Sequence, residues 1–186
     1  MKTLAIAAAL SAAALSAHAD ILPAGTLITG AVSGASTTLL GLDHSFADEA
    51  GSNITALSST DLEYLSGDYA IGIDLMTDGS VLLYGNTDSG ALPGNYTLTF
   101  SFASLPTALT GFTLVDTSHI TGGSVSATLL SANSIQFTLN NVTLDAPFST
   151  ITAQAVSAVP EPATWTLMMT GLGLVALRRT RFGGRA

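Results

Sequence analysis

The sequence predicts an all-β protein whose body is an antiparallel β-sandwich or jelly-roll-like domain, with an N-terminal helix and a single C-terminal hydrophobic helix. Three observations lead to this prediction. Apolar and polar residues alternate in several short runs, and no long amphipathic helical pattern occurs over residues 20–156. Turn-forming residues separate the runs roughly every 8–12 residues, as in many all-β domains. The body is long enough for one domain with a sizeable core.

Residues 1–19 have the pattern of a secretory signal peptide. Lys2 gives a positively charged start, and an apolar run dominated by alanine and leucine follows over residues 4–15. This run is shorter than the ~20 residues that a membrane-crossing helix needs. Ala17 and Ala19 place small side chains at the two positions that signal peptidase tests. We therefore expect export, with cleavage before Asp20.

The first third of the body gives weaker signals. Residues 26–32 and 37–42 resemble strands, separated near Gly34. Residues 60–66 could form one or two helical turns, because a threonine and a glutamate have capping-box spacing and a glycine follows.

The clearest local element is a hairpin over residues 69–84. Apolar residues alternate with small or polar ones as far as Thr77, and a second apolar run covers residues 81–84. Asp78-Gly79 lies between the runs and favours a tight type I′ turn, because both residues tolerate positive φ. One face of this hairpin should be buried and the other should face water.

Further strands follow the hairpin. They are expected over residues 96–102, 124–129, 135–139 and 148–156. The first of these has the strongest alternation in the chain, and its aromatic and leucine face should lie in the core. Asn140-Asn141 predicts another tight turn before the last strand. The chain thus divides into a signal peptide at 1–19, a β domain at 20–156 and a tail at 157–186.

The body is strongly acidic. Residues 20–158 contain twelve acids and no lysine or arginine, so their net charge is −12 with His44 and His119 neutral. Such a surface cannot gather phosphates, and we expect no nucleic-acid partner. The acids are scattered, so we interpret them as solubilising and expect no metal and no cofactor. The chain has no cysteine, which excludes thiol catalysis and leaves stability to the core.

Few residues could carry catalysis. His44 follows Asp43, and His119 lies shortly after Asp116, so a Ser-His-Asp site is conceivable. The chain contains neither a Gly-x-Ser-x-Gly elbow nor a His-Glu-x-x-His motif. We therefore interpret the histidines as isolated, name no catalytic residue and expect a non-enzymatic protein.

Three pairs of acids resemble parts of known sites. They are Asp48 with Glu49, Asp61 with Glu63, and Asp74 with Asp78. The first two could be glycosidase carboxylates, but neighbouring acids are commoner in solvated loops and no tryptophan of the body supports sugar stacking. The third flanks a glycine turn without EF-hand spacing, so hairpin chemistry explains it without a metal.

The tail has three consecutive parts. Pro160-Glu161-Pro162 prevents a helix from continuing through this point. Trp165 suits a membrane interface and begins an apolar segment, which an arginine cluster ends. The cluster comprises Arg178, Arg179 and Arg181. The helix would be ~22 Å long at ~1.5 Å per residue. This length is below the ~30 Å hydrocarbon core, so crossing requires snorkelling arginines or a thinned bilayer.

This order of elements resembles the PEP-CTERM sorting signal of Gram-negative bacteria, in the variant with tryptophan three residues after the second proline. Thr166 departs from that variant, which usually has alanine there. The resemblance implies processing by an exosortase, which would recognise Pro160, Glu161 and Pro162 and remove the helix and arginines. It also implies transient anchoring in the inner membrane with a cytoplasmic C-terminus, followed by a cell-surface or extracellular location.

We therefore expect an exported, non-enzymatic protein of the cell envelope or extracellular matrix. Its expected partners are an exosortase and the membrane, with exopolysaccharide or biofilm polymer as a further candidate. Two alternatives stay open. One is a lectin-like module that binds sugar, with or without Ca²⁺, through Tyr64, Tyr69, Tyr84 or Tyr96. The other is a hydrolase whose site follows no familiar motif.

Overall fold

The computed structural model describes residues 20–158, which contain eleven strands. The strands are β1 (Leu27–Gly34), β2 (Leu39–Gly41), β3 (Ile54–Ala56), β4 (Tyr64–Ser66), β5 (Ile71–Leu75), β6 (Ser80–Gly85), β7 (Tyr96–Phe102), β8 (Leu109–Asp116), β9 (Ile120–Ser131), β10 (Ser134–Leu144) and β11 (Thr150–Ser157). A short 3₁₀ turn, η1 (Leu42–His44), is the single helical element in this range. The all-β prediction is confirmed for the described residues.

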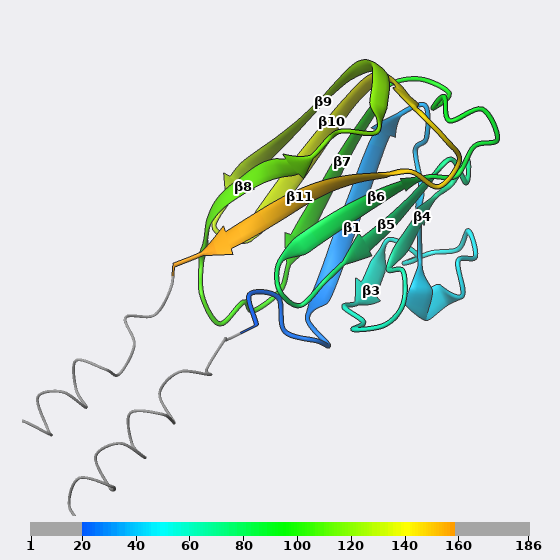
Figure 1. Ribbon diagram of the computed structural model, residues 1–186. Helices are drawn as coiled ribbons and strands as arrows, with labels where there is room; N and C mark the ends of the chain where they lie inside the picture. The colour runs from blue at the N-terminus through cyan, green and yellow to red at the C-terminus, as the bar shows by residue number, and fades with distance from the viewer. Residues whose placement is uncertain (1–19, 159–186) are drawn as a thin grey trace, which may run out of the picture. The chain divides into compact units, whose positions relative to one another are not determined.

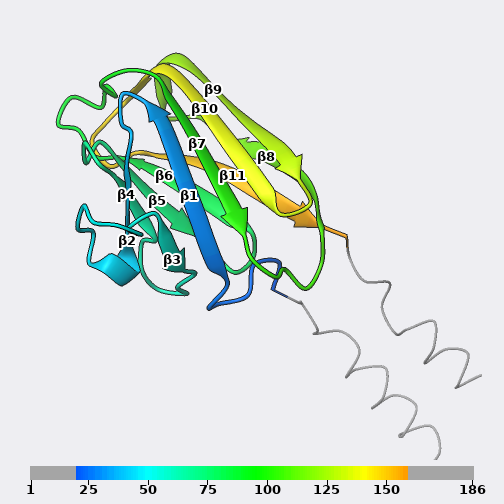
Figure 2. The same cartoon turned by 180° about the vertical axis from the view of Figure 1, so that it is seen from behind.

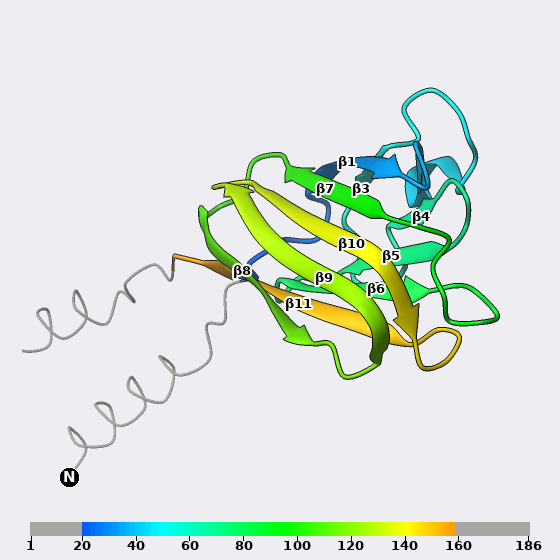
Figure 3. The same ribbon diagram turned by 90° about the horizontal axis from the view of Figure 1, so that it is seen from above.

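The strands form two antiparallel sheets (Figure 1). Sheet A has the order β3-β1-β7-β10-β9, and sheet B has the order β2-β4-β5-β6-β11-β8. Figure 2 shows sheet A in front, and Figure 3 shows the two sheets as separate layers. The eleven strands form a larger sandwich than the eight strands of a jelly roll.

The two predicted terminal helices lie outside the described residues, in 1–19 and 159–186. Between Asp20 and Ala158, the structure contains no helix with the length and apolar character needed to cross a membrane.

Aromatic side chains join the two sheets across the core. Phe112 of β8 meets Phe137 of β10 edge-on, with ring centroids 5.0 Å apart. Tyr64 of β4 and Phe100 of β7 have centroids 5.8 Å apart. The predicted alternation of β7 is confirmed, because its aromatic and leucine face is buried and its threonines are partly exposed. Burial of this apolar surface is the main favourable contribution to folding.

The outer face of sheet A is rich in hydroxyl and amide groups and uncharged. One row across four strands contains Ser33, Thr97, Thr138 and Ser126, held in register by the ladders of β1, β7, β10 and β9. None of the five strands of sheet A contains aspartate, glutamate, lysine or arginine.

The predicted hairpin is present as β5 and β6, but its turn is not type I′. That turn needs positive φ at both central residues. Gly79 has φ +87°, whereas Asp78 is not among the residues with positive φ. The Gly79 N–H donates to the carbonyl of Met76 at 2.9 Å, and Asp78 accepts the N–H of Ser80 at 2.8 Å. The loop is therefore one residue longer than predicted, with only its last residue left-handed.

The prediction of a tight turn at Asn140-Asn141 is wrong. β10 continues through both residues and contains a bulge, where Asn141 has φ +46° and the pairing with β9 shifts register. Asparagine tolerates left-handed backbone in a bulge as well as in a turn, so the dipeptide alone does not distinguish them. Gly123 lies opposite with φ +78°, and a Cβ there would be 2.3 Å from the Asn141 carbonyl oxygen.

The helical turns considered for residues 60–66 do not form, because the chain becomes β4 instead. Glu63 does not complete a capping box. Its carboxylate turns inward and accepts the N–H of Ser58 at 2.8 Å and the N–H of Leu75 at 2.6 Å. The contact with Leu75 joins residues twelve positions apart, so the local sequence pattern could not predict it.

Candidate functional site

The sorting and processing residues predicted at the two ends lie outside the described range. They are Ala17, Ala19, Pro160, Glu161, Pro162, Trp165, Arg178, Arg179 and Arg181. The described residues offer two paired histidines and two surface hollows.

Each histidine of the body contacts an acid other than its sequence neighbour. His44 Nδ1 lies 2.6 Å from Glu49 Oε1, and His119 Nδ1 lies 3.0 Å from Asp145 Oδ2. The hydrogen bond to Asp145 raises the pKa of His119 above its ordinary value. Ser149 donates to Asp145 at 2.6 Å, and this bond is the main cause of the lowered pKa of that acid.

These contacts differ from a Ser-His-Asp arrangement. In that arrangement the serine hydroxyl donates to the imidazole, which the acid holds from its other side. Here the Ser149 hydroxyl is bonded to the acid, Asp145. Among residues 20–158, neither histidine ring has a hydrogen bond with a serine hydroxyl.

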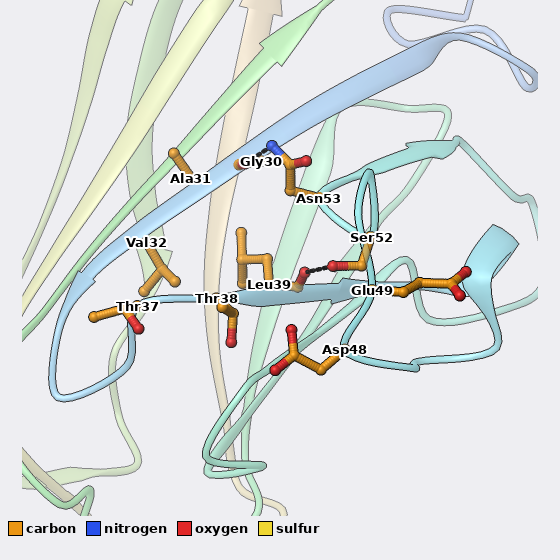
Figure 4. Close-up of a pocket in the computed structure, with 10 residues that line it drawn as sticks. All are labelled: Gly30, Ala31, Val32, Thr37, Thr38, Leu39, Asp48, Glu49, Ser52 and Asn53. Carbon is orange, nitrogen blue, oxygen red and sulfur yellow. Dashed lines mark hydrogen bonds between the residues drawn. The ribbon is translucent and has the colours of Figure 1, made fainter.

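The first hollow, of about 310 Å³, lies where β1 approaches β2 (Figure 4). Its lining comprises Gly30, Ala31, Val32, Thr37, Thr38, Leu39, Asp48, Glu49, Ser52 and Asn53. The loop before β3 borders it through two hydrogen bonds: Ser52 Oγ donates to the Leu39 carbonyl, and Asn53 Nδ2 donates to the Gly30 carbonyl, both at 3.1 Å.

The first hollow offers little chemistry beyond fixing this loop. Asp48 points toward Thr38, whereas Glu49 points away toward η1, so the two carboxylates do not converge (Figure 4). The described part of the chain contains no group of three or more histidine, cysteine, aspartate or glutamate residues that could hold a metal. A Cβ on Gly30 would lie 2.6 Å from Leu39 Cδ1, so glycine here permits close packing of β1 on β2.

The second hollow, of about 340 Å³, lies on the outer face of sheet B. Leu62, Leu65, Gly72, Asp74, Tyr84, Asn86 and Phe148 line it. Gly72 of β5 pairs with Tyr84 of β6, and Asp74 follows on the same face of β5. Tyr84 and Asp74 lie close enough for each to influence the pKa of the other. Partial burial is the main cause of the raised pKa of both groups.

Backbone contacts fix the borders of the second hollow. Asn86 donates its backbone N–H to the Ala70 carbonyl and its side-chain Nδ2 to the Tyr69 carbonyl, each at 2.8 Å. Phe148 has φ +61°, is 67% exposed, and donates its N–H to the Gly85 carbonyl at 2.7 Å. Left-handed backbone is rare for a bulky residue and, where it is held this firmly, is a reason to look for function.

The structure separates the four tyrosines that were candidates for sugar binding. Tyr64 and Tyr96 are fully buried, so their selection as surface ligands is wrong. Their hydroxyls hold the fold together, with Tyr64 donating to the Ile28 carbonyl at 2.7 Å and Tyr96 donating to Asp68. Tyr69 is exposed, and Tyr84 borders the second hollow.

Sequence reasoning missed part of the second hollow. The alternation before the turn already places Asp74 on the face turned away from the core, which was a usable signal, whereas Tyr84 joins it through the pairing with Gly72. Phe148 comes from a distant loop between β10 and β11, and nothing in the local pattern links it to the hairpin.

Comparison with known protein families gives one match. Residues 158–181 match the family model of the PEP-CTERM protein-sorting motif. The matched range contains the predicted sorting residues from Pro160 to Arg181 and only the last described residue of the β-sandwich. No curated protein and no solved structure matches the chain.

Proposed function

Because this chain carries the PEP-CTERM protein-sorting motif and is therefore an exported protein with a C-terminal sorting signal, we propose that its β-sandwich is a non-enzymatic component of the cell envelope or extracellular matrix. The motif at residues 158–181 is the observation that carries this proposal. The C-terminal helix holds the exported chain in the inner membrane, and an exosortase then removes the helix and the arginines. The trimmed domain acts at the cell surface or outside, together with exopolysaccharide or biofilm polymer.

Two features of the body support this proposal. A domain of net charge −12 without lysine or arginine is suited to remaining dispersed in a crowded extracellular layer. Each histidine is engaged by an acid, an arrangement that stabilises loops and needs no substrate.

Mass spectrometry of the mature protein from its native host tests the processing. We expect an N-terminus near Asp20 and a new C-terminus between Pro160 and Pro162. Trypsin should leave this product uncut, because lysine and arginine occur only in the removed ends. A protein that keeps Arg178 through Ala186 in the host would contradict the proposal.

A variant pair sharpens this experiment. Replacing Pro160, Glu161 and Pro162 by alanine should leave the full-length chain in the inner-membrane fraction, because the recognition residues are lost. Ser157→Ala lies just before the matched range and should be trimmed like the wild type. Equal trimming of both variants would show that the motif is not what the processing enzyme reads.

The non-enzymatic part of the proposal has its own test. Hydrolase assays on the purified protein with glycan, ester and peptide substrates should show no turnover. A turnover that His44→Ala or His119→Ala abolishes would contradict the proposal and favour a histidine mechanism.

The second candidate function is carbohydrate binding. The second hollow favours it, because aromatic and aliphatic walls surround a carboxylate and an amide there. A glycan array probed with and without a chelator distinguishes the two functions. Binding to any glycan favours the lectin-like function, and loss of that binding with chelator indicates a Ca²⁺-dependent form.

A further inference from the structure

We propose that the second hollow, on the outer face of sheet B, binds one neutral sugar residue of a polysaccharide chain. The apolar face of the sugar would lie against Phe148 and Leu62, and its hydroxyls would bond to Asp74 and Asn86. The inference deepens the second candidate function, carbohydrate binding, and rests on the proposed function in placing the domain outside the cell, where polysaccharide is present.

The walls of the hollow match the apolar side of a sugar ring. A pyranose has a flat face of C–H groups and a rim of hydroxyls. Leu62, Leu65 and Phe148 give the hollow apolar walls, and Gly72 leaves its floor without a side chain. A Cβ on Gly72 would lie 3.3 Å from Leu62 Cδ1, so a larger residue would crowd this space. Ligand sites commonly combine such walls with a few well-placed polar groups.

The polar groups of the hollow can accept hydrogen bonds from hydroxyls. The Asp74 carboxylate has about four lone-pair positions, and the neighbouring Tyr84 hydroxyl could occupy only one of them, so the carboxylate retains acceptor capacity. Asn86 uses its Nδ2 for the Tyr69 carbonyl, which leaves its amide oxygen turned to other donors. Within residues 20–158 that oxygen accepts no hydrogen bond.

The hollow is ordered before any ligand binds. Two hydrogen bonds fix Asn86 to the loop between β4 and β5, and the Phe148 N–H is fixed to the end of β6. Phe148 keeps its ring exposed at the border of the hollow, on left-handed backbone. A site whose side chains are already fixed loses less entropy on binding.

Charge selects a neutral sugar over an acidic one. Asp74 lies in the hollow, and residues 20–158 carry twelve acids and no lysine or arginine. A uronic acid or a sulfated sugar would meet repulsion from this field with no cation to offset it.

Calorimetric titration of the full-length protein tests the inference. The protein is kept in a detergent without a sugar head group and is titrated with four hexasaccharides. These are the β-1,4-, α-1,4- and β-1,3-linked glucose hexamers and a galacturonic acid hexamer. At least one neutral hexamer should bind, and the acidic hexamer should not.

Variants locate the binding. Phe148→Asn removes the ring but keeps a residue that tolerates positive φ, and it should weaken binding about tenfold or more. Asp74→Asn should weaken it about threefold or more. Leu130→Ala removes an apolar side chain of similar exposure from β9 of sheet A, and it should leave the affinity unchanged.

Several outcomes would overturn the inference: no binding of any neutral hexamer, binding of the acidic hexamer alone, or binding that both hollow variants leave unchanged. Circular dichroism melting of each variant separates lost binding from lost folding. Tyr84→Phe is a second variant of the hollow for the binding measurement, and it removes only a hydroxyl. A protein that is trimmed correctly in its host yet binds no sugar would overturn this inference and leave the proposed function standing.

Discussion

The two sheets of the sandwich are built in different ways. Sheet A is regular, its strands carry no charged residue, and its outer face presents mainly hydroxyl and amide groups. Sheet B contains Asp74 and Asp116 in its strands, and carboxylates in its loops accept backbone N–H groups. Loop side chains bond to sheet A as well, as Asn53 does to Gly30 of β1, but only sheet B carries carboxylates within its strands. The second hollow occurs on sheet B, where those loops are fixed.

The largest effect should come from the packed side of sheet A. Phe137→Ala removes a fully buried ring that meets Phe112, so the free energy of unfolding should fall by about 4 kcal/mol. Phe148→Ala removes the same ring from an exposed position and should cost less than about 1 kcal/mol. Urea denaturation of the full-length protein measures both, and similar losses would contradict this account of the core.

The buried carboxylate of sheet B should give the next largest effect. Glu63→Ala leaves the N–H groups of Ser58 and Leu75 without their acceptor, at a cost of about 3 kcal/mol in unfolding free energy. Asp61→Ala removes a neighbouring but exposed acid and should cost less than about 1 kcal/mol. If urea denaturation gave the same midpoint for both variants, the inward contacts of Glu63 would not matter to stability.

A bond between the sheets should have a smaller effect. Tyr96 of sheet A donates to Asp68, which lies in the loop between β4 and β5 of sheet B. Tyr96→Phe keeps the ring and removes a hydrogen bond to a charged group, so unfolding free energy should fall by about 2 kcal/mol. Tyr69→Phe changes an exposed tyrosine and serves as the control, with no expected loss on thermal melting. An unchanged melting temperature for Tyr96→Phe would contradict the prediction.

Glu63 should also make stability depend on pH. Burial raises its folded-state pKa from 4.5 to about 7, with Asp74 as a nearby charge that adds to the rise. The contribution of protonated Glu63 to the free energy of unfolding is complete below pH 4.5 and is lost as the pH rises through about 7. Relative to Glu63→Gln, which does not titrate, the wild type should therefore become more stable between pH 7 and pH 4.5. A stability difference that stays constant across this window would show that Glu63 does not titrate as stated.

The smallest effect should be a titration shift without a large change in stability. Asp145→Asn removes the acid that raises the pKa of His119, so this pKa should fall toward 6.5 in an NMR titration. Asp116→Asn removes a weaker contributor and should lower the pKa less. A larger fall in the His119 pKa for Asp116→Asn than for Asp145→Asn would show that Asp116 is the main partner of the imidazole and would contradict this prediction.

The difference between the sheets also explains what the sequence could predict. Strands β7 and β5 follow an alternation that one stretch of sequence displays completely, whereas β6 was found from its apolar run and the turn before it. β8 was missed because its apolar residues do not alternate cleanly and Val115 is 65% exposed. The inward role of Glu63 depends on Leu75, which becomes its neighbour only after β4 and β5 pair.

The same reasoning applies to the candidate sites. The sorting motif was recognised from sequence because its residues are contiguous, and the family match over 158–181 confirms it. The second hollow combines Asp74 and Tyr84 from one hairpin with Phe148 from another part of the chain. The hairpin part of the hollow could therefore be predicted from sequence patterns, whereas the position of Phe148 could be known only from the three-dimensional structure.

The sandwich is closed differently along its two sides. On one side β8 and β9 lie against each other, and the bulge at Gly123 and Asn141 bends the long strands there. On the other side, the segment between β2 and β3 forms no ladder and is attached near its two ends, by backbone bonds and by the side chains of Asp43, Ser52 and Asn53. Amide hydrogen exchange should therefore be fastest in this segment, which can swing outward while both ladders stay intact. Such local opening would make it the first place that an extracellular protease cuts the folded domain.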